Sequence, residues 1–218
     1  MANFKAAIFD LDGTLLDTLE TLSYYGNRAL ETFGLRPYPK ADYRYMVGDG
    51  AKMLIHRMLE RQNADKSELF EKAYRHYIDT YNKDKLFKTE IYEGIPALLK
   101  GLREQDVRLA VLSNKPHEAT VPILKHFFGE TAFDEMRGAM EGIPLKPDPT
   151  AALDVANILG VMPEECIYVG DTAVDMETGK RAGFFTVGVL WGFRDAEELR
   201  EGGADRIVST PEEILEIL

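Results

Sequence analysis

Short apolar runs of strand length recur along the chain and alternate with segments of helical length. The runs cover residues 4–9, 107–113, 166–170, 184–190 and 206–208. Runs this apolar are typical of strands buried on both faces of a sheet. Strands that alternate with helices indicate βαβ units, so the pattern predicts an α/β fold with a doubly wound, Rossmann-like parallel sheet.

Two of the expected helices carry recognisable end signals. Asp148 precedes Pro149 at the expected start of one helix, and Gly160 is expected to end it. The sequence Thr-Pro-Glu-Glu at residues 210–213 predicts a capping box at the start of the last helix. These signals support helices between and after the later strands.

Residues 19 to about 88 interrupt the alternation, because no convincing strand occurs there. Apolar residues instead recur at helical spacing in three stretches, namely Leu22, Tyr25, Ala29, Leu30 and Phe33, then Ala51, Leu54, Ile55, Met58 and Leu59, then Phe70, Ala73, Tyr74, Tyr77, Ile78 and Tyr81. Asp65 with Glu68 is expected to cap the third helix. We therefore predict a helical cap domain at residues 17–88, inserted into a core formed by residues 1–16 and 89–218. The cap is expected to overhang the carboxyl end of the first strand.

The charge balance and the cysteine count narrow the range of partners and compartments. The 218-residue chain has a net charge of −11 and no basic run, which disfavours nucleic acid and anionic membrane surfaces as partners. Its single cysteine, Cys166, cannot form an internal disulfide and is expected to be a reduced core thiol. No apolar run approaches the roughly 18 residues of a membrane span, and the first residues lack a signal-peptide pattern. We expect a cytoplasmic protein, either a monomer or a homodimer.

Polar side chains stand at the ends of three predicted strands and before one predicted helix. In chain order they are Asp10, Asp12, Ser113, Lys146, Asp171 and Asp175. Because the carboxyl ends of parallel strands meet at one edge of a sheet, we expect these side chains to share one crevice. Clustered carboxylates suit a hard cation such as Mg²⁺, and a hydroxyl with a lysine suits the oxygens of a phosphate. The combination predicts phosphoryl transfer.

Each of these residues alone also fits a structural role. Aspartates often cap turns after strands, and Asp171 could cap the helix that begins near Thr172. Asp175 could pair with Lys180 or Arg181, and Ser113 and Lys146 could be a turn residue and a surface cation. The four motifs in this order favour a shared active site over four unrelated structural roles.

The motifs D-x-D-G-T, a strand-ending serine, K-P-x-P and G-D-x-x-x-D together resemble the haloacid dehalogenase superfamily of phosphohydrolases. The likeness covers nearly the whole chain, and the helical insertion resembles the helical cap of that superfamily. Within it, the segments "MVGDGAKML" (46–54) and "WGFRDAEELREGGAD" (191–205) are similar to phosphoglycolate phosphatases.

The resemblance implies a role for each acid. Asp10 is expected to be the nucleophile that forms an aspartyl-phosphate, and Asp12 the general acid and then the general base. The side chains of Asp10 and Asp171 and the backbone carbonyl of Asp12 are expected to bind Mg²⁺. Asp175 is expected to hold a metal-bound water or to orient Lys146.

The resemblance also implies how the substrate is bound. Thr14, Ser113 and Asn114 are expected to bind the phosphoryl oxygens, and Lys146 to neutralise charge on the nucleophile and the phosphate. In the cap, Gly48 and Gly50 precede a helix whose N–H groups favour an anion, and Lys52, Arg57 and Arg28 are nearby cations in the sequence. This part of the cap is expected to bind a second negative group of the substrate, such as the carboxylate of 2-phosphoglycolate.

Related activities can be compared with the chain directly. A dehalogenase would lack the second acid, and a sugar-phosphate mutase usually has a histidine where this chain has Leu22. A phosphonate hydrolase would need an early cap lysine, but none occurs between Lys5 and Lys40. A receiver-like phospho-acceptor module would be shorter and would lack both the cap and the second acid. The sequence therefore predicts a Mg²⁺-dependent phosphatase of a small phosphorylated metabolite, with pyrophosphatase or a broad-range sugar or nucleotide phosphatase as open alternatives.

Overall fold

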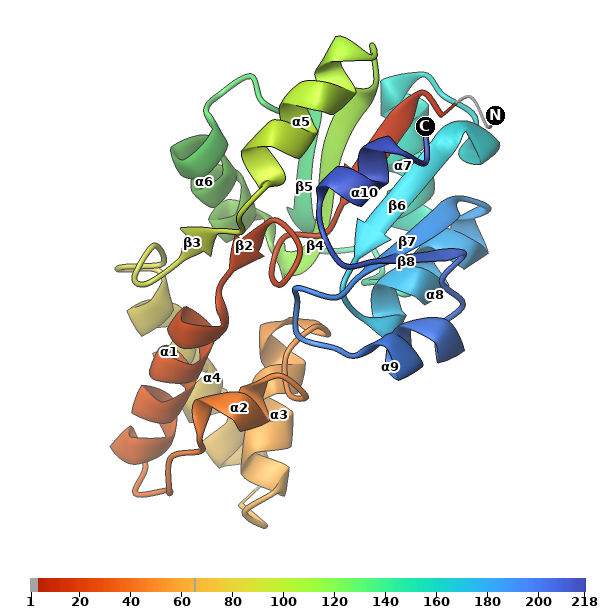
Figure 1. Cartoon of the computed structure of the whole chain (residues 1–218). Coiled ribbons are helices and arrows are strands. Elements are labelled where there is room, and N and C mark those ends of the chain that lie inside the picture. Colours follow the sequence, from red (N-terminus) through yellow and green to blue (C-terminus); the bar gives the residue numbers. More distant parts are fainter. Residues whose placement is uncertain (1–3, 65) are drawn as a thin grey trace. The chain divides into compact units, whose positions relative to one another are not determined.

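The chain divides into two compact units (Figure 1). The computed structural model describes residues 4–64 and 66–218. The core unit comprises Met1–Asp17 and Ile91–Leu218, and the helical unit comprises Thr18–Glu90. Within the described residues, no helix is both long enough and apolar enough to cross a bilayer.

The core unit is built on a six-stranded sheet with the order β5-β4-β1-β6-β7-β8. Its strands are β1 (Ala6–Phe9), β4 (Arg108–Pro116), β5 (Glu135–Ala139), β6 (Cys166–Gly170), β7 (Phe185–Val189) and β8 (Arg206–Val208). Every neighbouring pair is parallel. All five strands expected from the apolar runs are present, so the predicted parallel α/β sheet is confirmed.

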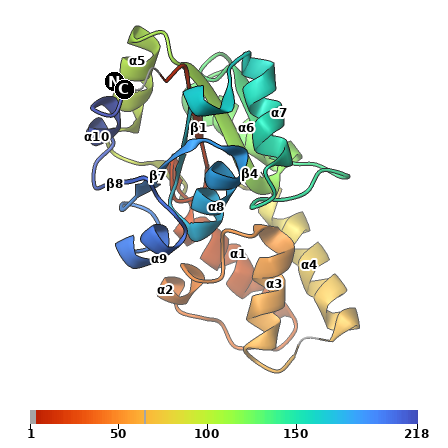
Figure 2. The ribbon, with the colours of Figure 1, turned by 90° about the vertical axis from the view of Figure 1, so that its right-hand side faces the viewer.

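Helices cover both faces of this sheet. One face of β1, β4 and β6 packs against α7 (Thr150–Leu159), where Ile8, Leu112 and Tyr168 belong to one buried cluster with Val155. The other face is covered by α5 (Ile95–Glu104), which also contacts α10 (Glu212–Leu215) (Figure 2). The remaining helices of the core unit are α6 (His117–Phe128), the 3₁₀ helix η1 (Pro163–Glu165), α8 (Ala173–Ala182) and α9 (Ala196–Glu201). The sheet is therefore doubly wound, as the uniformly apolar strands predicted.

The expected helix ends are close to the observed ones. Helix α7 begins at Thr150 rather than at Pro149, and the Asp148 carboxylate accepts a hydrogen bond from the Thr150 N–H at 2.9 Å. Gly160 ends this helix in the left-handed conformation, with φ of +70°. At α10, the Glu213 carboxylate accepts the hydrogen bond of the Thr210 N–H at 3.0 Å, which is one half of the predicted capping box.

The edge strand β5 was not expected from the sequence. Its residues read Glu-Met-Arg-Gly-Ala, and four of the five are only partly buried. A strand at the edge of a sheet has a neighbour on one side only, so it lacks the continuous apolar run of a central strand. The central strand β4 extends to Pro116, three residues past the predicted end, with a shift in register against β5 between Leu112 and Pro116. This extension carries Ser113, Asn114 and Lys115.

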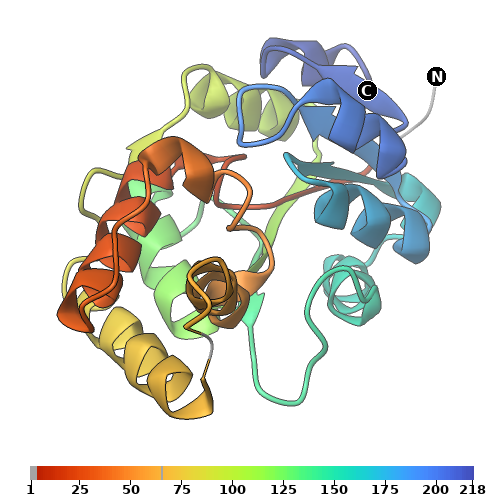
Figure 3. The ribbon, with the colours of Figure 1, turned by 90° about the horizontal axis from the view of Figure 1, so that it is seen from below.

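In the described part of the helical unit, the three predicted helices are present together with one short additional helix. They are α1 (Leu19–Thr32), α2 (Lys40–Tyr43), α3 (Gly50–Glu60) and α4 (Ser67–Tyr81). Helices α1 and α4 pack side by side (Figure 3), and α3 also contacts α4. Their contact faces bury Leu22, Leu30, Ile55, Met58 and Tyr77, which belong to the predicted apolar stripes. Asp65, expected as a cap of α4, lies outside the described residues.

Strands β2 (Leu16–Asp17) and β3 (Glu90–Ile91) form a separate two-stranded sheet, which the sequence did not predict.

Cys166 is a buried free thiol, and burial raises its pKa to about 12. An inert core thiol is what its apolar surroundings predicted.

Candidate active site

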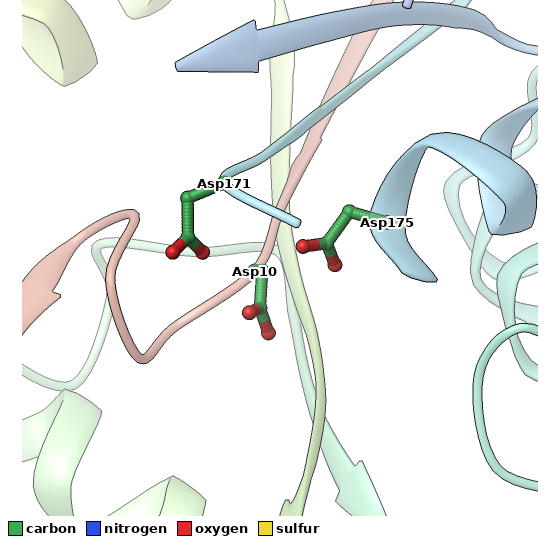
Figure 4. Close-up of side chains that lie close together, drawn as sticks. All are labelled: Asp10, Asp171 and Asp175. Atoms are coloured by element: carbon green, nitrogen blue, oxygen red, sulfur yellow. The ribbon is translucent and has the colours of Figure 1, made fainter. Parts of the chain in front are cut away.

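Three buried aspartates converge where β1 and β6 end (Figure 4). Asp10 follows β1, Asp171 follows β6, and Asp175 lies in the first turn of α8. One carboxylate oxygen from each lies within 4.8 Å of the others. The parallel register causes this convergence, because Phe9 pairs with Val169 and the next residues leave the sheet at the same edge. The structure thus brings together three of the acids that follow the predicted strands.

Lys146 lies against two of these carboxylates. Its Nζ atom is 2.6 Å from Oδ1 of Asp175 and 2.9 Å from Oδ1 of Asp10, and its side chain is 3% exposed. Burial disfavours the ammonium, but the charges of Asp10 and Asp175 outweigh it and hold the pKa of Lys146 well above its usual value. Asp175 therefore pairs with Lys146, whereas Lys180 and Arg181 pair with Asp205 and Glu177.

The carboxylates carry more negative charge than this one ammonium balances. Burial raises the pKa of Asp10 to about 6, with Lys146 opposing the shift and Asp175 adding to it. Burial, followed by the charges of Asp175 and Asp10, raises the pKa of Asp171 well above its usual value. The Oδ1 atom of Asp10 is buried at ion-pair distance from Lys146 but without the geometry of a hydrogen bond. A cluster of hard oxygen donors with surplus negative charge fits a divalent cation such as Mg²⁺.

Two loops bring backbone and hydroxyl donors to Asp171. Its Oδ1 atom accepts a hydrogen bond from the Thr14 hydroxyl at 3.2 Å, and its Oδ2 atom accepts one from the Phe193 N–H at 2.8 Å. Close approach requires glycine on both loops, since a Cβ on Gly13 or Gly192 would lie 2.3 Å from an atom of Asp171. Gly13 also has φ of +89°, a conformation that favours glycine. The D-x-D-G-T motif thus supports Asp171 as well as carrying Asp10.

The second acid of this motif, Asp12, is held by a lysine that was not assigned from the sequence. Lys115 Nζ lies 2.7 Å from Oδ1 and 2.6 Å from Oδ2 of Asp12. The lysine side chain is 6% exposed and the aspartate side chain 18%. Lys115 directly follows Ser113 and Asn114 at the end of a buried strand, and this position was the available signal that its ammonium faces the same edge as the acids.

The expected phosphate-binding residues have different surroundings. Ser113 is buried, and its hydroxyl accepts a hydrogen bond from the Lys115 N–H at 3.2 Å. The Asn114 side chain lies against the backbone of Lys146, where it accepts from the N–H at 2.8 Å and donates to the carbonyl at 3.1 Å. The Thr14 hydroxyl is directed to Asp171. Of the three, Thr14 contacts the acid cluster directly, Asn114 supports the segment that carries Lys146, and Ser113 contacts the backbone of Lys115.

The residues expected to read a second anionic group lie in the helical unit. Gly48 and Gly50 have φ of +116° and +85°, and Gly50 begins α3. Lys52 is exposed, with its Nζ atom 5.8 Å from the centre of the Tyr74 ring. Arg57 instead donates to the Met46 carbonyl at 2.9 Å and pairs with the Asp49 carboxylate, so this cation supports the loop before α3.

Known proteins are similar to this chain in sequence and in fold. A sequence profile of the haloacid dehalogenase-like hydrolases matches residues 7–189. The phosphoglycolate phosphatase of Psychrobacter arcticus is 32% identical over 199 residues, which cover 89% of this chain and 86% of the relative. That of Aquifex aeolicus is 31% identical over 214 residues, covering 98% and 96%.

A crystal structure from Lactobacillus delbrueckii subsp. bulgaricus, described as a candidate phosphoglycolate phosphatase, superposes with a TM-score of 0.94. It is 31% identical and the match covers 99% of this chain and 98% of that one. The profile match alone extends over most of the core unit and the whole helical unit. The chain therefore belongs to the haloacid dehalogenase-like hydrolase family.

Proposed function

We propose that the protein is a Mg²⁺-dependent phosphomonoester hydrolase that forms an aspartyl-phosphate on Asp10, and that 2-phosphoglycolate is its substrate. The observation that carries the proposal is the convergence of Asp10 with Asp171, Asp175 and Lys146. One carboxylate oxygen of each acid lies within 4.8 Å of the others, and the Lys146 ammonium lies 2.9 Å from Asp10. Cations held beside a carboxylate nucleophile also offset the charge of the phosphoryl group that it attacks. The names of the relatives from Psychrobacter arcticus and Aquifex aeolicus support phosphoglycolate as the substrate.

The family resemblance suggests the metal ligands. The carboxylates of Asp10 and Asp171, which belong to the buried cluster, would hold Mg²⁺ together with the backbone carbonyl of Asp12. When bound, Mg²⁺ neutralises charge on the carboxylates and on the phosphoryl group. Asp175 has a different role, because its Oδ1 atom is paired with Lys146 and its Oδ2 atom accepts from Thr172. This contact pattern supports the alternative in which Asp175 orients Lys146.

The protein groups then carry the reaction in two steps. In the first, the Asp10 carboxylate forms a bond to phosphorus while the bond from phosphorus to the ester oxygen breaks, and Asp12 gives its proton to the departing alkoxide. In the second, Asp12 takes a proton from water as the water oxygen attacks phosphorus, which releases phosphate and restores the Asp10 carboxylate. Lys146 offsets the negative charge of Asp10 and of the phosphoryl oxygens, and Ser113 and Thr14 bind those oxygens.

We further propose that residues 17–88 act as a cap that excludes water from the aspartyl-phosphate. Gly48 and Gly50 both have positive φ, Gly50 begins α3, and a helix N-terminus favours an anion. Lys52, in the first turn of α3, adds a cation. These features support recognition of a substrate carboxylate by the cap.

The proposal is tested by multiple-turnover assays with Mg²⁺ on 2-phosphoglycolate, ethyl phosphate, pyrophosphate and a panel of sugar and nucleotide phosphates. We expect the highest kcat/KM with 2-phosphoglycolate, and no turnover by Asp10→Asn, whose amide is similar in shape but not nucleophilic. A single equivalent of product followed by arrest would indicate a receiver-like module. Equal kcat/KM for 2-phosphoglycolate and ethyl phosphate would exclude the carboxylate-reading cap and leave a general phosphatase.

A further inference from the structure

The ion pair between Lys115 and Asp12 belongs to no motif role described above. The lysine reaches both carboxylate oxygens, at 2.7 Å and 2.6 Å, so the two contacts fix the rotation of the carboxylate as well as its position. The pair joins residues 103 positions apart in the chain. Both side chains are largely removed from solvent, where an ion pair is screened less than on the surface.

The backbone that carries Lys115 is anchored on several sides. Its N–H donates to the Ser113 hydroxyl at 3.2 Å, and its carbonyl accepts from the Thr120 hydroxyl at 3.1 Å. A Cβ on Gly138 would lie 2.5 Å from the same carbonyl, so glycine at this position in β5 permits the close approach. The ammonium therefore extends from a fixed point at the end of a central strand.

The other half of the pair sits in a tight loop. The N–H groups of Leu15 and Leu16 both donate to the Leu11 carbonyl, at 3.1 Å and 3.0 Å, and Gly13 N–H donates to the Leu16 carbonyl at 2.8 Å. These bonds fix the backbone of Asp12 but not the direction of its side chain. Among the described contacts of that side chain, the one with Lys115 sets its direction.

We propose that Lys115 is a positioning residue that holds the Asp12 carboxyl group where it protonates the leaving alcohol. The inference rests on the proposed function, in which Asp12 is the general acid. Proton transfer needs the donor within hydrogen-bond reach of the ester oxygen and in a fixed orientation. Each lysine thus pairs with different acids: Lys146 contacts Asp10 and Asp175, and Lys115 contacts Asp12.

The test uses leaving groups that differ in their need for a proton. The alcohol of 2-phosphoglycolate must be protonated as it departs, whereas p-nitrophenolate is a stable anion and needs no acid. The value of kcat/KM reports the steps up to release of the alcohol, so it isolates the protonation step from the later attack of water. We compare kcat/KM on 2-phosphoglycolate and on p-nitrophenyl phosphate for the wild type, Lys115→Met and Lys100→Met, the last as a control at an exposed lysine.

General acid catalysis contributes about 10²–10⁴-fold, and we expect Lys115→Met to lower kcat/KM on 2-phosphoglycolate at least about tenfold more than on p-nitrophenyl phosphate. Lys100→Met should leave both values unchanged. An equal loss on both substrates would overturn the positioning role. Lys115→Gln keeps hydrogen-bond donors on a shorter, uncharged side chain, so it takes the place of Lys115→Met if thermal unfolding finds that variant unfolded.

A double-mutant cycle separates an effect through Asp12 from a direct one. In an Asp12→Asn background, adding Lys115→Met should leave the ratio of the two kcat/KM values unchanged, because the acid it positions is already absent. A further change in the ratio in that background would show that Lys115 acts independently of Asp12. Absence of Mg²⁺-dependent turnover in the wild type would instead overturn the proposed function itself, whereas turnover with an unmoved ratio overturns only the role of Lys115.

Discussion

The Nζ atom of Lys146 lies 2.6 Å from Oδ1 of Asp175, and both side chains are buried. The same aspartate caps α8, since its Oδ2 atom accepts hydrogen bonds from the Thr172 hydroxyl at 2.7 Å and from the Thr172 N–H at 3.1 Å. One carboxylate therefore links the start of a helix to the ammonium of the active site. The position of Lys146 depends on a local helix-capping arrangement as well as on the charges of the acid cluster.

This link predicts unequal stability losses for two neighbouring substitutions. Thr172→Ala removes a helix cap, which typically lowers the free energy of unfolding by about 1 kcal/mol. Asp175→Ala removes the cap contacts and also one partner of a buried ion pair. We expect it to lower the free energy of unfolding by about 3 kcal/mol, the low end of the usual range for a broken buried pair, because Lys146 keeps Asp10 as a partner. Denaturant unfolding in the presence of a chelator measures both. Equal losses would mean that the ion pair adds nothing to the stability of the cap.

Asp171→Asn is expected to stabilise the metal-free protein and to abolish its response to Mg²⁺. Burial, Asp175 and Asp10 raise the pKa of Asp171, so its ionised form lowers stability at neutral pH, where the unfolded chain carries the same charge at no such cost. The amide of asparagine can accept from the Phe193 N–H and donate to the Thr14 hydroxyl, which can rotate.

Thermal unfolding with and without Mg²⁺ measures this effect without any assay of activity. With a chelator present, we expect the Tm of Asp171→Asn to exceed that of the wild type by at least about 2 °C. Added Mg²⁺ should raise the Tm of the wild type and leave that of the variant unchanged. A variant that is less stable than the wild type under chelation would contradict the cost assigned to the buried charge.

Asp205 lies outside the site, and its lowered pKa predicts that the stability of the protein depends on pH. Burial acts to raise its pKa, but hydrogen bonds from Lys180 and from the Thr186 N–H and hydroxyl outweigh burial, and the pKa is lowered. A lowered pKa stabilises the folded state above the unfolded pKa of about 4, and this contribution disappears as the pH falls through the lower folded value. Asp205→Asn should lower the free energy of unfolding by about 1 kcal/mol at neutral pH. Urea unfolding at several pH values should find that the difference shrinks below about pH 4, and a constant difference would contradict the assignment.

The strand ends and the acid cluster were predictable because buried parallel strands have a strong hydrophobic signature. Asp10 and Asp171 follow such strands directly, and parallel pairing brings adjacent strand ends together. The edge strand β5 was not predicted, since its half-exposed residues lack that signature. The contacts of Lys115 and Asn114 were also missed. Their partners lie 103 and 32 residues away, and a lysine after a strand usually indicates a surface position rather than a buried ion pair.

Helix α3 carries a cation, Lys52, in its first turn. Lys52 is exposed and is expected to attract the carboxylate of 2-phosphoglycolate through its charge and through the N-terminus of the helix. Lys52→Met should therefore lower kcat/KM on 2-phosphoglycolate about threefold to tenfold while sparing p-nitrophenyl phosphate, the range that about 1 kcal/mol of lost attraction allows. Lys72→Met is the matched control, because Lys72 is an exposed lysine on α4 of the same unit and pairs with Glu68. Steady-state kinetics on both substrates decides the matter: if Lys72→Met and Lys52→Met have the same effect, the preference for a carboxylate does not originate at the start of α3.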